Sequence, residues 1–243
     1  MAEKIYLEGA KGGVGCTTVA CGLGMTLSAA GERTLILDGD SRCGSALSVS
    51  GCTGMQVFTV ADYQRGACRA KQAIVQHPKY KNLYIMPTLG CADVAAPEDA
   101  IREVDGLFDY ILCDGTALKA CKRAIIVTEP YLPAIKAADG AACRLKDGGA
   151  RLWGIIVNKV NGGLIADGRE NSPEDIAAAL NVPLVAALPE DLELTLGQWR
   201  PYSLKYYRTA VARIRGRQAK IPEFERGYSG AGGFFRKKMR EKI

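Results

Sequence analysis

The stretch GAKGGVGCTT, residues 9–18, decides the fold of this chain. Its spacing is close to that of a phosphate-binding loop, G-x-x-x-x-G-K-[ST]. In such a loop, backbone N–H groups surround the phosphates and a Lys reaches the β- and γ-phosphates. Cys16 stands at the position of that Lys, and Ala10 at the position of the first Gly. Two interpretations follow: the loop binds a nucleotide, or it has the backbone shape of a phosphate-binding loop without binding one.

Short apolar runs alternate with helical patterns on both sides of this loop, nearly to residue 200. Their continuous hydrophobicity is typical of strands that are covered on both faces. The pattern predicts an α/β fold with a mostly parallel, twisted sheet flanked by helices. The expected strands are KIYLE (4–8), TLILD (34–38), LYIMP (83–87), DYILCD (109–114), RAIIVT (123–128), LWGIIVNK (152–159) and LVAALP (184–189).

The chain divides into one large domain and a C-terminal appendage. We expect a nucleotide-binding domain over residues 1–200, with helices over 17–30 and from SPEDIAAAL, which Ser172 would cap. Residues 201–226 are expected to form a helix packed on the domain. Its apolar positions recur at helical spacing and are Leu204, Tyr207, Val211 and Ile214. A Gly-rich linker and basic tail fill 227–243.

The composition is that of a soluble globular protein, with 243 residues, 48% hydrophobic and 24% charged. No apolar run is long enough to span a membrane, and the N-terminus has no secretory signal pattern, so we expect a cytoplasmic protein. The nine cysteines contain no C-x-x-C pair and are expected to be mostly reduced packing residues. His77 is expected in a surface loop, and Trp153 and Trp199 in packing roles.

The context of the opening loop favours anion binding. An expected strand ends at Glu8, and an expected helix begins near Cys16. Glycines at 12, 13 and 15 let the backbone close on an anion, and the helix N-terminus adds N–H groups and its dipole. Thr17 stands where the hydroxyl of such a loop would hold Mg²⁺.

KGGVGCTT resembles the deviant Walker A loop, KGGxGKT[ST], of the MinD/ParA class of P-loop ATPases. The resemblance implies binding of ATP with Mg²⁺ and a homodimer formed around the nucleotide. In that dimer, Lys11 would reach the ATP of the partner subunit. The implied nucleotide-binding residues of the loop are Gly12, Gly13, Val14, Gly15, Cys16, Thr17 and Thr18.

Other motifs extend the resemblance across residues 4–191. LILDGD places Asp40 where the family positions the attacking water, and DYILCDG places Asp114 at the end of the Walker B strand. IIVTEP resembles the family's IIVTNP, IIVNK places Asn158 at the adenine, and VAALPED resembles the adenine loop. The resemblance thus implies catalytic roles for Lys11, Asp40 and Asp114, magnesium at Thr17, Asp40 and Asp114, and nucleotide contacts from Asn158, Pro189 and Asp191.

Two departures bear on activity. DGTALKACKR after Walker B is shorter than the family's switch II, and Cys16 lacks the Walker charge. Losing one charge-assisted contact to phosphate removes about 1.5 to 3 kcal/mol, or roughly tenfold to 150-fold in affinity. Two alternatives stay open, a weak ATPase and a catalytically dead pseudo-ATPase scaffold.

The basic charge of the chain is concentrated at its C-terminus. From Arg200 onward there are 13 Lys and Arg against 3 acids, and the last residues, FFRKKMREKI, form a basic amphipathic pattern. Such a segment suits an anionic bilayer, and MinD proteins carry a similar membrane-targeting helix. We expect peripheral attachment at the cytoplasmic face of the membrane through residues 228–243, and rank DNA below the membrane as the anionic partner.

The resemblance implies a positioning switch that acts with an unidentified protein partner, in cell division, in flagellum or pilus placement, or in partition. A rival within the same superfamily is the nitrogenase iron protein type. There, two cysteines per subunit hold an Fe₄S₄ cluster across a dimer. Cys91 and Cys121 fall near the positions of such ligands.

Overall fold

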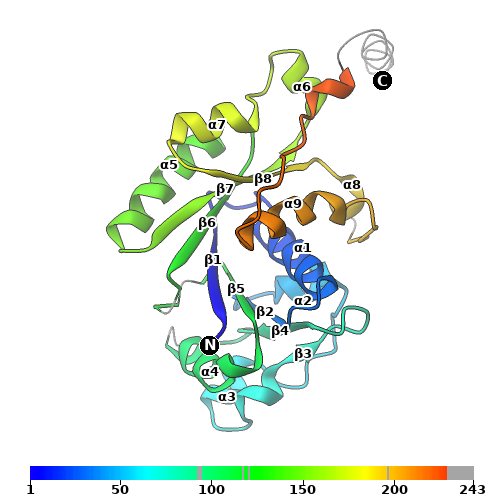
Figure 1. The fold of residues 1–243 in the computed structure, drawn as a ribbon. Coiled ribbons are helices and arrows are strands. Elements are labelled where there is room, and N and C mark those ends of the chain that lie inside the picture. The colour runs from blue at the N-terminus through cyan, green and yellow to red at the C-terminus, as the bar shows by residue number, and fades with distance from the viewer. Residues whose placement is uncertain (92–94, 117, 120, 196, 229–243) are drawn as a thin grey trace.

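An eight-stranded sheet forms the centre of the computed structural model, which describes residues 1–91, 95–116, 118–119, 121–195 and 197–228 (Figure 1). The strand order is β3-β4-β2-β5-β1-β6-β7-β8, and β3 is antiparallel to β4 while the other pairs are parallel. The strands are β1 (Glu3–Gly9), β2 (Thr34–Asp38), β3 (Val75–Gln76), β4 (Leu83–Pro87), β5 (Tyr110–Asp114), β6 (Arg123–Thr128), β7 (Arg151–Val160) and β8 (Leu184–Pro189).

Helices cover both faces of this sheet. On one face lie α1, α2 and α9, and on the other lie α3, α4, α5 and α7 (Figure 1). The helices are α1 (Cys16–Ala29), α2 (Ser45–Ser50), α3 (Val60–Gln64), α4 (Ala96–Val104), α5 (Leu132–Asp147), α6 (Gly162–Ala166), α7 (Pro173–Leu180), α8 (Leu192–Thr195) and α9 (Leu204–Ile214). Short 3-10 turns occupy Ala70–Ala73, Asp105–Leu107 and Glu225–Tyr228. The predicted fold class is confirmed.

All seven predicted strands are present, and four of them have the predicted bounds. They were recognisable because both faces are buried, so nearly every position in them is apolar. The sequence missed β3, a two-residue edge strand that is too short to carry a periodic pattern. The predicted cap of α7 is confirmed, since the Asp175 amide donates to Ser172 Oγ at 3.1 Å.

The prediction for His77 is wrong, because the side chain is buried and not on the surface. Its Nδ1 accepts from the backbone amides of Lys79 and Tyr80, at 3.0 and 3.1 Å, which leaves Nε2 as the donor to the Ser50 carbonyl at 3.1 Å. Burial lowers the pKa of this imidazole. The ring therefore joins α2 to the loop between β3 and β4 as a neutral hydrogen-bonding group.

The cysteines are free thiols of mixed exposure. Three are buried, as expected for packing residues, whereas Cys43 and Cys143 are exposed. Trp153 and Trp199 pack against the core, as predicted. Within the described part of the chain, no helix has the length and hydropathy needed to cross a bilayer. The predicted basic tail lies outside the described residues from position 229 onward.

The predicted C-terminal helix is α9, and it docks on α1 through a buried aromatic ring. Leu204, Tyr207, Val211 and Ile214 are all buried, as their spacing predicts. Tyr207 fits over Gly22 of α1, where a Cβ atom would lie only 2.3 Å from Tyr207 Cε1. Gly22 is therefore required for the close approach of the ring.

Tyr207 provides a test of this packing, because its buried hydroxyl has no hydrogen-bond partner within the described residues. We predict that Tyr207→Phe leaves the free energy of unfolding unchanged or raises it by about 1 kcal/mol. Tyr207→Ala should lower it by about 3 to 5 kcal/mol, because a large cavity is left. Urea denaturation measures both, and a loss above about 1 kcal/mol in the Phe variant would contradict the packing described.

Candidate functional site

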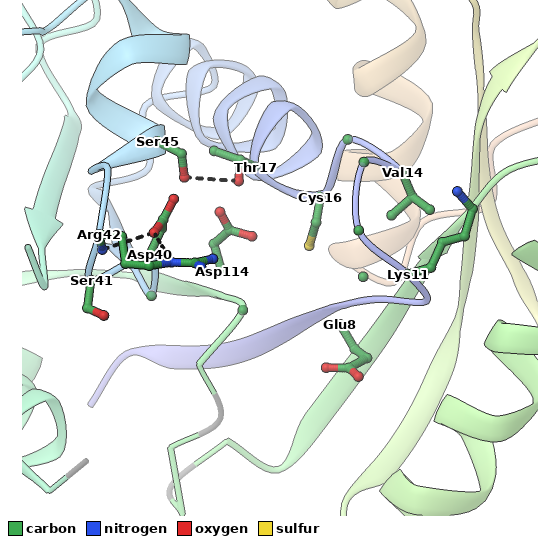
Figure 2. A pocket seen from close by; sticks show the side chains of 16 residues that line it. Glu8, Lys11, Val14, Cys16, Thr17, Asp40, Ser41, Arg42, Ser45 and Asp114 are labelled. Atoms are coloured by element: carbon green, nitrogen blue, oxygen red, sulfur yellow. Dashed lines mark hydrogen bonds and ion pairs between the residues drawn. The ribbon is translucent and has the colours of Figure 1, made fainter. Parts of the chain in front are cut away.

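A cavity of about 680 Å³ lies at the carboxyl ends of β1, β5 and β2 (Figure 2). Parallel strands end at the same edge of a sheet, and a crevice forms there where the chain changes direction across the sheet. Here β1 lies between β5 and β6, so the segments after β1, β2 and β5 converge. Of the predicted site residues, the cavity brings together Lys11, Gly12, Gly13, Val14, Gly15, Cys16, Thr17, Asp40 and Asp114.

Left-handed glycines shape the loop between β1 and α1. Gly13 and Gly15 both have φ of +84°, and Gly15 is the residue that precedes the first turn of α1. Asn158, at the end of β7, donates from Nδ2 to the Val14 carbonyl at 2.9 Å. A Cβ atom at Gly15 would lie 2.5 Å from that Nδ2. Asn158 therefore supports the loop directly, an interaction that the sequence did not indicate.

Cys16 contributes a neutral thiol to the cavity. Its Sγ lies 3.4 Å from the Leu7 carbonyl, and it faces the Asp114 carboxylate. Burial, and then the negative charge of Asp114, raise the pKa of this thiol well above its usual value. At neutral pH the position has no charge, so it supplies neither the ammonium of a Walker Lys nor the negative charge of a thiolate.

Asp40 and Asp114 line the cavity, and Asp38 is buried next to the lining residue Ser45. Asp38 accepts from the amides of Ala46 at 2.8 Å and Asp40 at 3.1 Å, while its burial raises its pKa to about 6. Burial also raises the pKa of Asp114, and contacts with Thr17 and Cys16 moderate the rise. Each carboxylate is thus costly to keep ionised without a cation.

Hydroxyl groups lie next to these carboxylates. Thr17 Oγ1 lies 3.4 Å from Ser45 Oγ (Figure 2). Ser45 Oγ in turn lies 3.4 Å from Asp38 Oδ1. Asp40 accepts from the Arg42 amide at 3.0 Å. Oxygen atoms of carboxylates and hydroxyls are the ligands that a hard divalent cation prefers. The sequence analysis missed Asp38 and Ser45. Asp38 could have been found as the first Asp of LILDGD, whereas no motif indicated Ser45.

Lys11 lies at the other end of the cavity, where its side chain points away from Cys16 and Asp114 (Figure 2). Its Nζ lies 3.7 Å from Glu129 Oε2 and 5.3 Å from the centre of the Tyr131 ring. Lys159 binds the same Glu129 at 2.5 Å and donates to the Gly13 carbonyl at 2.7 Å. Glu129, the Glu of IIVTEP where the resembling pattern has Asn, is thus shared by two lysines.

The other predicted nucleotide contacts do not line this cavity. Thr18 lies in the first turn of α1, and Pro189 is the last residue of β8. Asp191 accepts from the Glu193 amide at 3.0 Å and from the hydroxyls of Tyr202 and Ser203, at 3.2 and 2.6 Å. Asp191 therefore joins α8 to the start of α9, and an adenine contact stays a prediction.

Comparisons with known proteins agree with this geometry. A family model described as the CobQ/CobB/MinD/ParA nucleotide binding domain matches residues 5–197. The chain is 29% identical over 241 residues to the septum site-determining protein MinD of Thermotoga maritima, covering 89% of each chain. It is 27% identical over 210 residues to MinD of Bacillus subtilis, covering 80% of this chain and 78% of that protein.

Solved structures of similar fold include the MinD cell division protein of Aquifex aeolicus. Its TM-score is 0.80 at 24% identity, covering 91% of this chain and 100% of that one. MinD of Pyrococcus horikoshii, solved as a complex with Mg-ADP, has a TM-score of 0.76 at 26% identity, covering 88% and 96%.

The loop conformation is tested by two matched glycine substitutions. Gly15→Ala should lower the free energy of unfolding by about 1 to 3 kcal/mol, because its left-handed conformation disfavours a side chain and Asn158 occupies the space. Gly12→Ala should change it by less than about 0.5 kcal/mol, because nothing lies within 4 Å of its added Cβ. Denaturant unfolding measures both, and equal effects would contradict the loop geometry.

Proposed function

The chain belongs to the CobQ/CobB/MinD/ParA nucleotide-binding domain family, and from this membership we propose that it is a MinD-like ATP-binding protein acting as a nucleotide-dependent dimeric switch at the membrane. One observation carries the proposal. The glycine loop, Thr17, Asp40 and Asp114 come from three different strand ends, yet all line one cavity. Such an arrangement suits a phosphate chain with a divalent cation.

The proposed ligand is ATP with Mg²⁺. Backbone N–H groups of residues 12–18 would hold the phosphates, and Thr17, Asp40 and Asp114 would face the cation. A bound Mg²⁺ would take phosphate and water oxygens as its further ligands and would neutralise phosphate charge. The Pyrococcus horikoshii MinD structure contains Mg-ADP, which supports this assignment. Asn158, Pro189 and Asp191 are proposed for the adenine side.

Cys16 makes nucleotide binding weaker than in a loop with two lysines, and it affects hydrolysis more than binding. Phosphoryl transfer depends on cations that neutralise the migrating group, and the neutral thiol supplies no charge. We propose a weak ATPase, in which Asp40 and Asp114 keep the groups for water and metal. The catalytically dead pseudo-ATPase scaffold is the alternative, and phosphate release by the unaltered chain separates the two.

Dimerisation is proposed because Lys11 is retained. In its own subunit Lys11 lies by Glu129 and Tyr131, away from Cys16, so its charge is available to a nucleotide held by a second copy. The MinC:MinD complex of Aquifex aeolicus shows a relative of this fold assembled with another protein. We propose a protein partner here too, with division-site selection, flagellum or pilus placement, or partition as the cellular task.

The iron–sulfur alternative receives less support from the geometry. Cys121 lies 3.4 Å from Cys113, and Cys91 lies 3.7 Å from Gln64 Oε1, so each thiol contacts a residue other than its expected partner. We therefore rank the nucleotide switch first.

Restoring the Walker charge tests the nucleotide site. Cys16→Lys should raise ATP affinity roughly tenfold to 150-fold, because it adds one charge-assisted phosphate contact. It should also raise the rate of ATP hydrolysis. Calorimetric titration and phosphate release measure the two effects, with Cys16→Ser as the matched control, since it changes the thiol without adding charge. If the Lys variant gains neither affinity nor turnover, Cys16 is not what limits the protein.

Deleting the tail tests the proposed membrane attachment. The full chain with ATP should co-sediment with phosphatidylglycerol vesicles, while a chain lacking residues 228–243 should stay in the supernatant. Two tails presented by a dimer bind more strongly than one, so omitting ATP should weaken sedimentation of the full chain. Neutral phosphatidylcholine vesicles are the control. Equal binding by both chains would exclude the tail as the anchor, and a salt-dependent shift of duplex DNA would favour DNA instead.

A further inference from the structure

Two thiols lie side by side behind the nucleotide cavity. Cys113 is the buried residue just before Asp114 in β5, and Cys121 is half-buried just before β6. Their Sγ atoms are 3.4 Å apart, which is a thiol–thiol contact. A disulfide has its sulfurs about 2.05 Å apart, so they would have to approach by about 1.4 Å. The two cysteines are thus placed for a bond with little rearrangement.

A second cavity gives access to one of the two sulfurs. It measures about 430 Å³, and Cys121 lines it together with Tyr6, Lys119 and Arg144. Lys119 and Arg144 are both exposed basic residues, and Arg144 lies 3.4 Å from Glu8 at the cavity wall. The lining therefore has a thiol, two cationic side chains and one carboxylate, Glu8, and its net positive charge suits a small anionic ligand.

The surroundings of the two thiols fix the order in which they react. Cys113 is fully buried, so a reagent from solution reaches Cys121 first. The pKa of Cys121 is lowered, chiefly by its hydrogen bond with the neighbouring Cys113 thiol. The accessible sulfur is thus the better nucleophile, and Cys113 is placed to react second.

We propose that Cys121 and Cys113 form a redox pair that is oxidised by a small anionic disulfide, of the kind that glutathione forms, bound in this second cavity. In the first step, the Cys121 sulfur attacks one sulfur of the small disulfide. The S–S bond breaks, and the first small thiol leaves with the proton that Cys121 has lost. A mixed disulfide remains on Cys121.

In the second step, the Cys113 sulfur attacks the Cys121 sulfur. The second small thiol leaves with the proton from Cys113, and a Cys113–Cys121 bond remains. The protein loses two thiols and two electrons, while the small disulfide is reduced to two thiols. The bond would link the end of β5 to the start of β6 across the segment that follows Asp114. Any effect on nucleotide binding rests on the proposed function, but the oxidation itself does not.

The test uses the full chain without nucleotide, incubated with oxidised glutathione, alkylated and mapped by mass spectrometry. The expected product is a Cys113–Cys121 disulfide. Cys113→Ser should instead accumulate glutathione on Cys121, and Cys121→Ser should leave Cys113 unmodified. Exposed Cys143 provides the control, because Cys143→Ser should still form the bond. Circular dichroism confirms that each variant is folded, and Cys113→Ala serves if the Ser variant is not.

Charge reversal tests the cavity itself. The variant Lys119→Glu with Arg144→Glu should slow oxidation by glutathione disulfide about tenfold, which corresponds to about 1.4 kcal/mol. The rate with uncharged hydroxyethyl disulfide should not change. Glutathione mapped to Cys43 or Cys143 while Cys113 and Cys121 stay reduced would overturn the proposal. An equal slowing with both reagents would overturn the role of the cavity.

Discussion

The parallel pairing of β5 with β1 and with β2 is the constraint on which the candidate site depends. In register, Asp114 lies beside Leu7 of β1 on one side and beside Asp38 of β2 on the other. The loop that follows β1 and the turn that follows β2 must therefore open next to the Asp114 carboxylate. Backbone hydrogen bonds between the strands are thus sufficient to make neighbours of residues more than 70 positions apart in the chain. No side-chain contact within the site is needed for this.

This arrangement concentrates negative charge where the Walker ammonium is missing. Asp40 and Asp114 line the cavity with a neutral Cys16, Asp38 is buried next to the lining residue Ser45, and Lys11 points to the far end of the cavity. Burial raises the pKa of Asp38 to about 6 and also raises the pKa of Asp114. An anionic phosphate bound here would depend on an accompanying divalent cation more strongly than in a loop that has kept its Lys.

Elements with a periodic or local sequence pattern could be predicted from the sequence. Contacts between residues far apart in the chain could not. Apolar runs identified the strands, and helical spacing identified Leu204 and Tyr207 on α9. The contact of Asn158 with Val14 joins residues 144 positions apart, and neither residue type indicates it. His77 looked like a surface residue because it precedes a proline, but the turn directs its ring inward to Ser50. Such pairs follow from topology and not from a local pattern.

Cys16 and Glu129 both depart from the resembling pattern, and both bear on how a lysine could reach the phosphates. Glu129 is 3% exposed and lies near two ammonium groups, with Lys159 at 2.5 Å and Lys11 at 3.7 Å. If Lys11 moves toward a second subunit, Lys159 still forms an ion pair with Glu129. The buried carboxylate of Glu129 is therefore not left without a cation. Tyr131 and Glu129 raise the pKa of Lys11, so its side chain is a cation in the single subunit. Under the proposed function, Cys16 would make no charged phosphate contact within its own subunit, whereas Lys11 would leave Glu129 at little cost, so the proposed chemistry would depend on dimerisation.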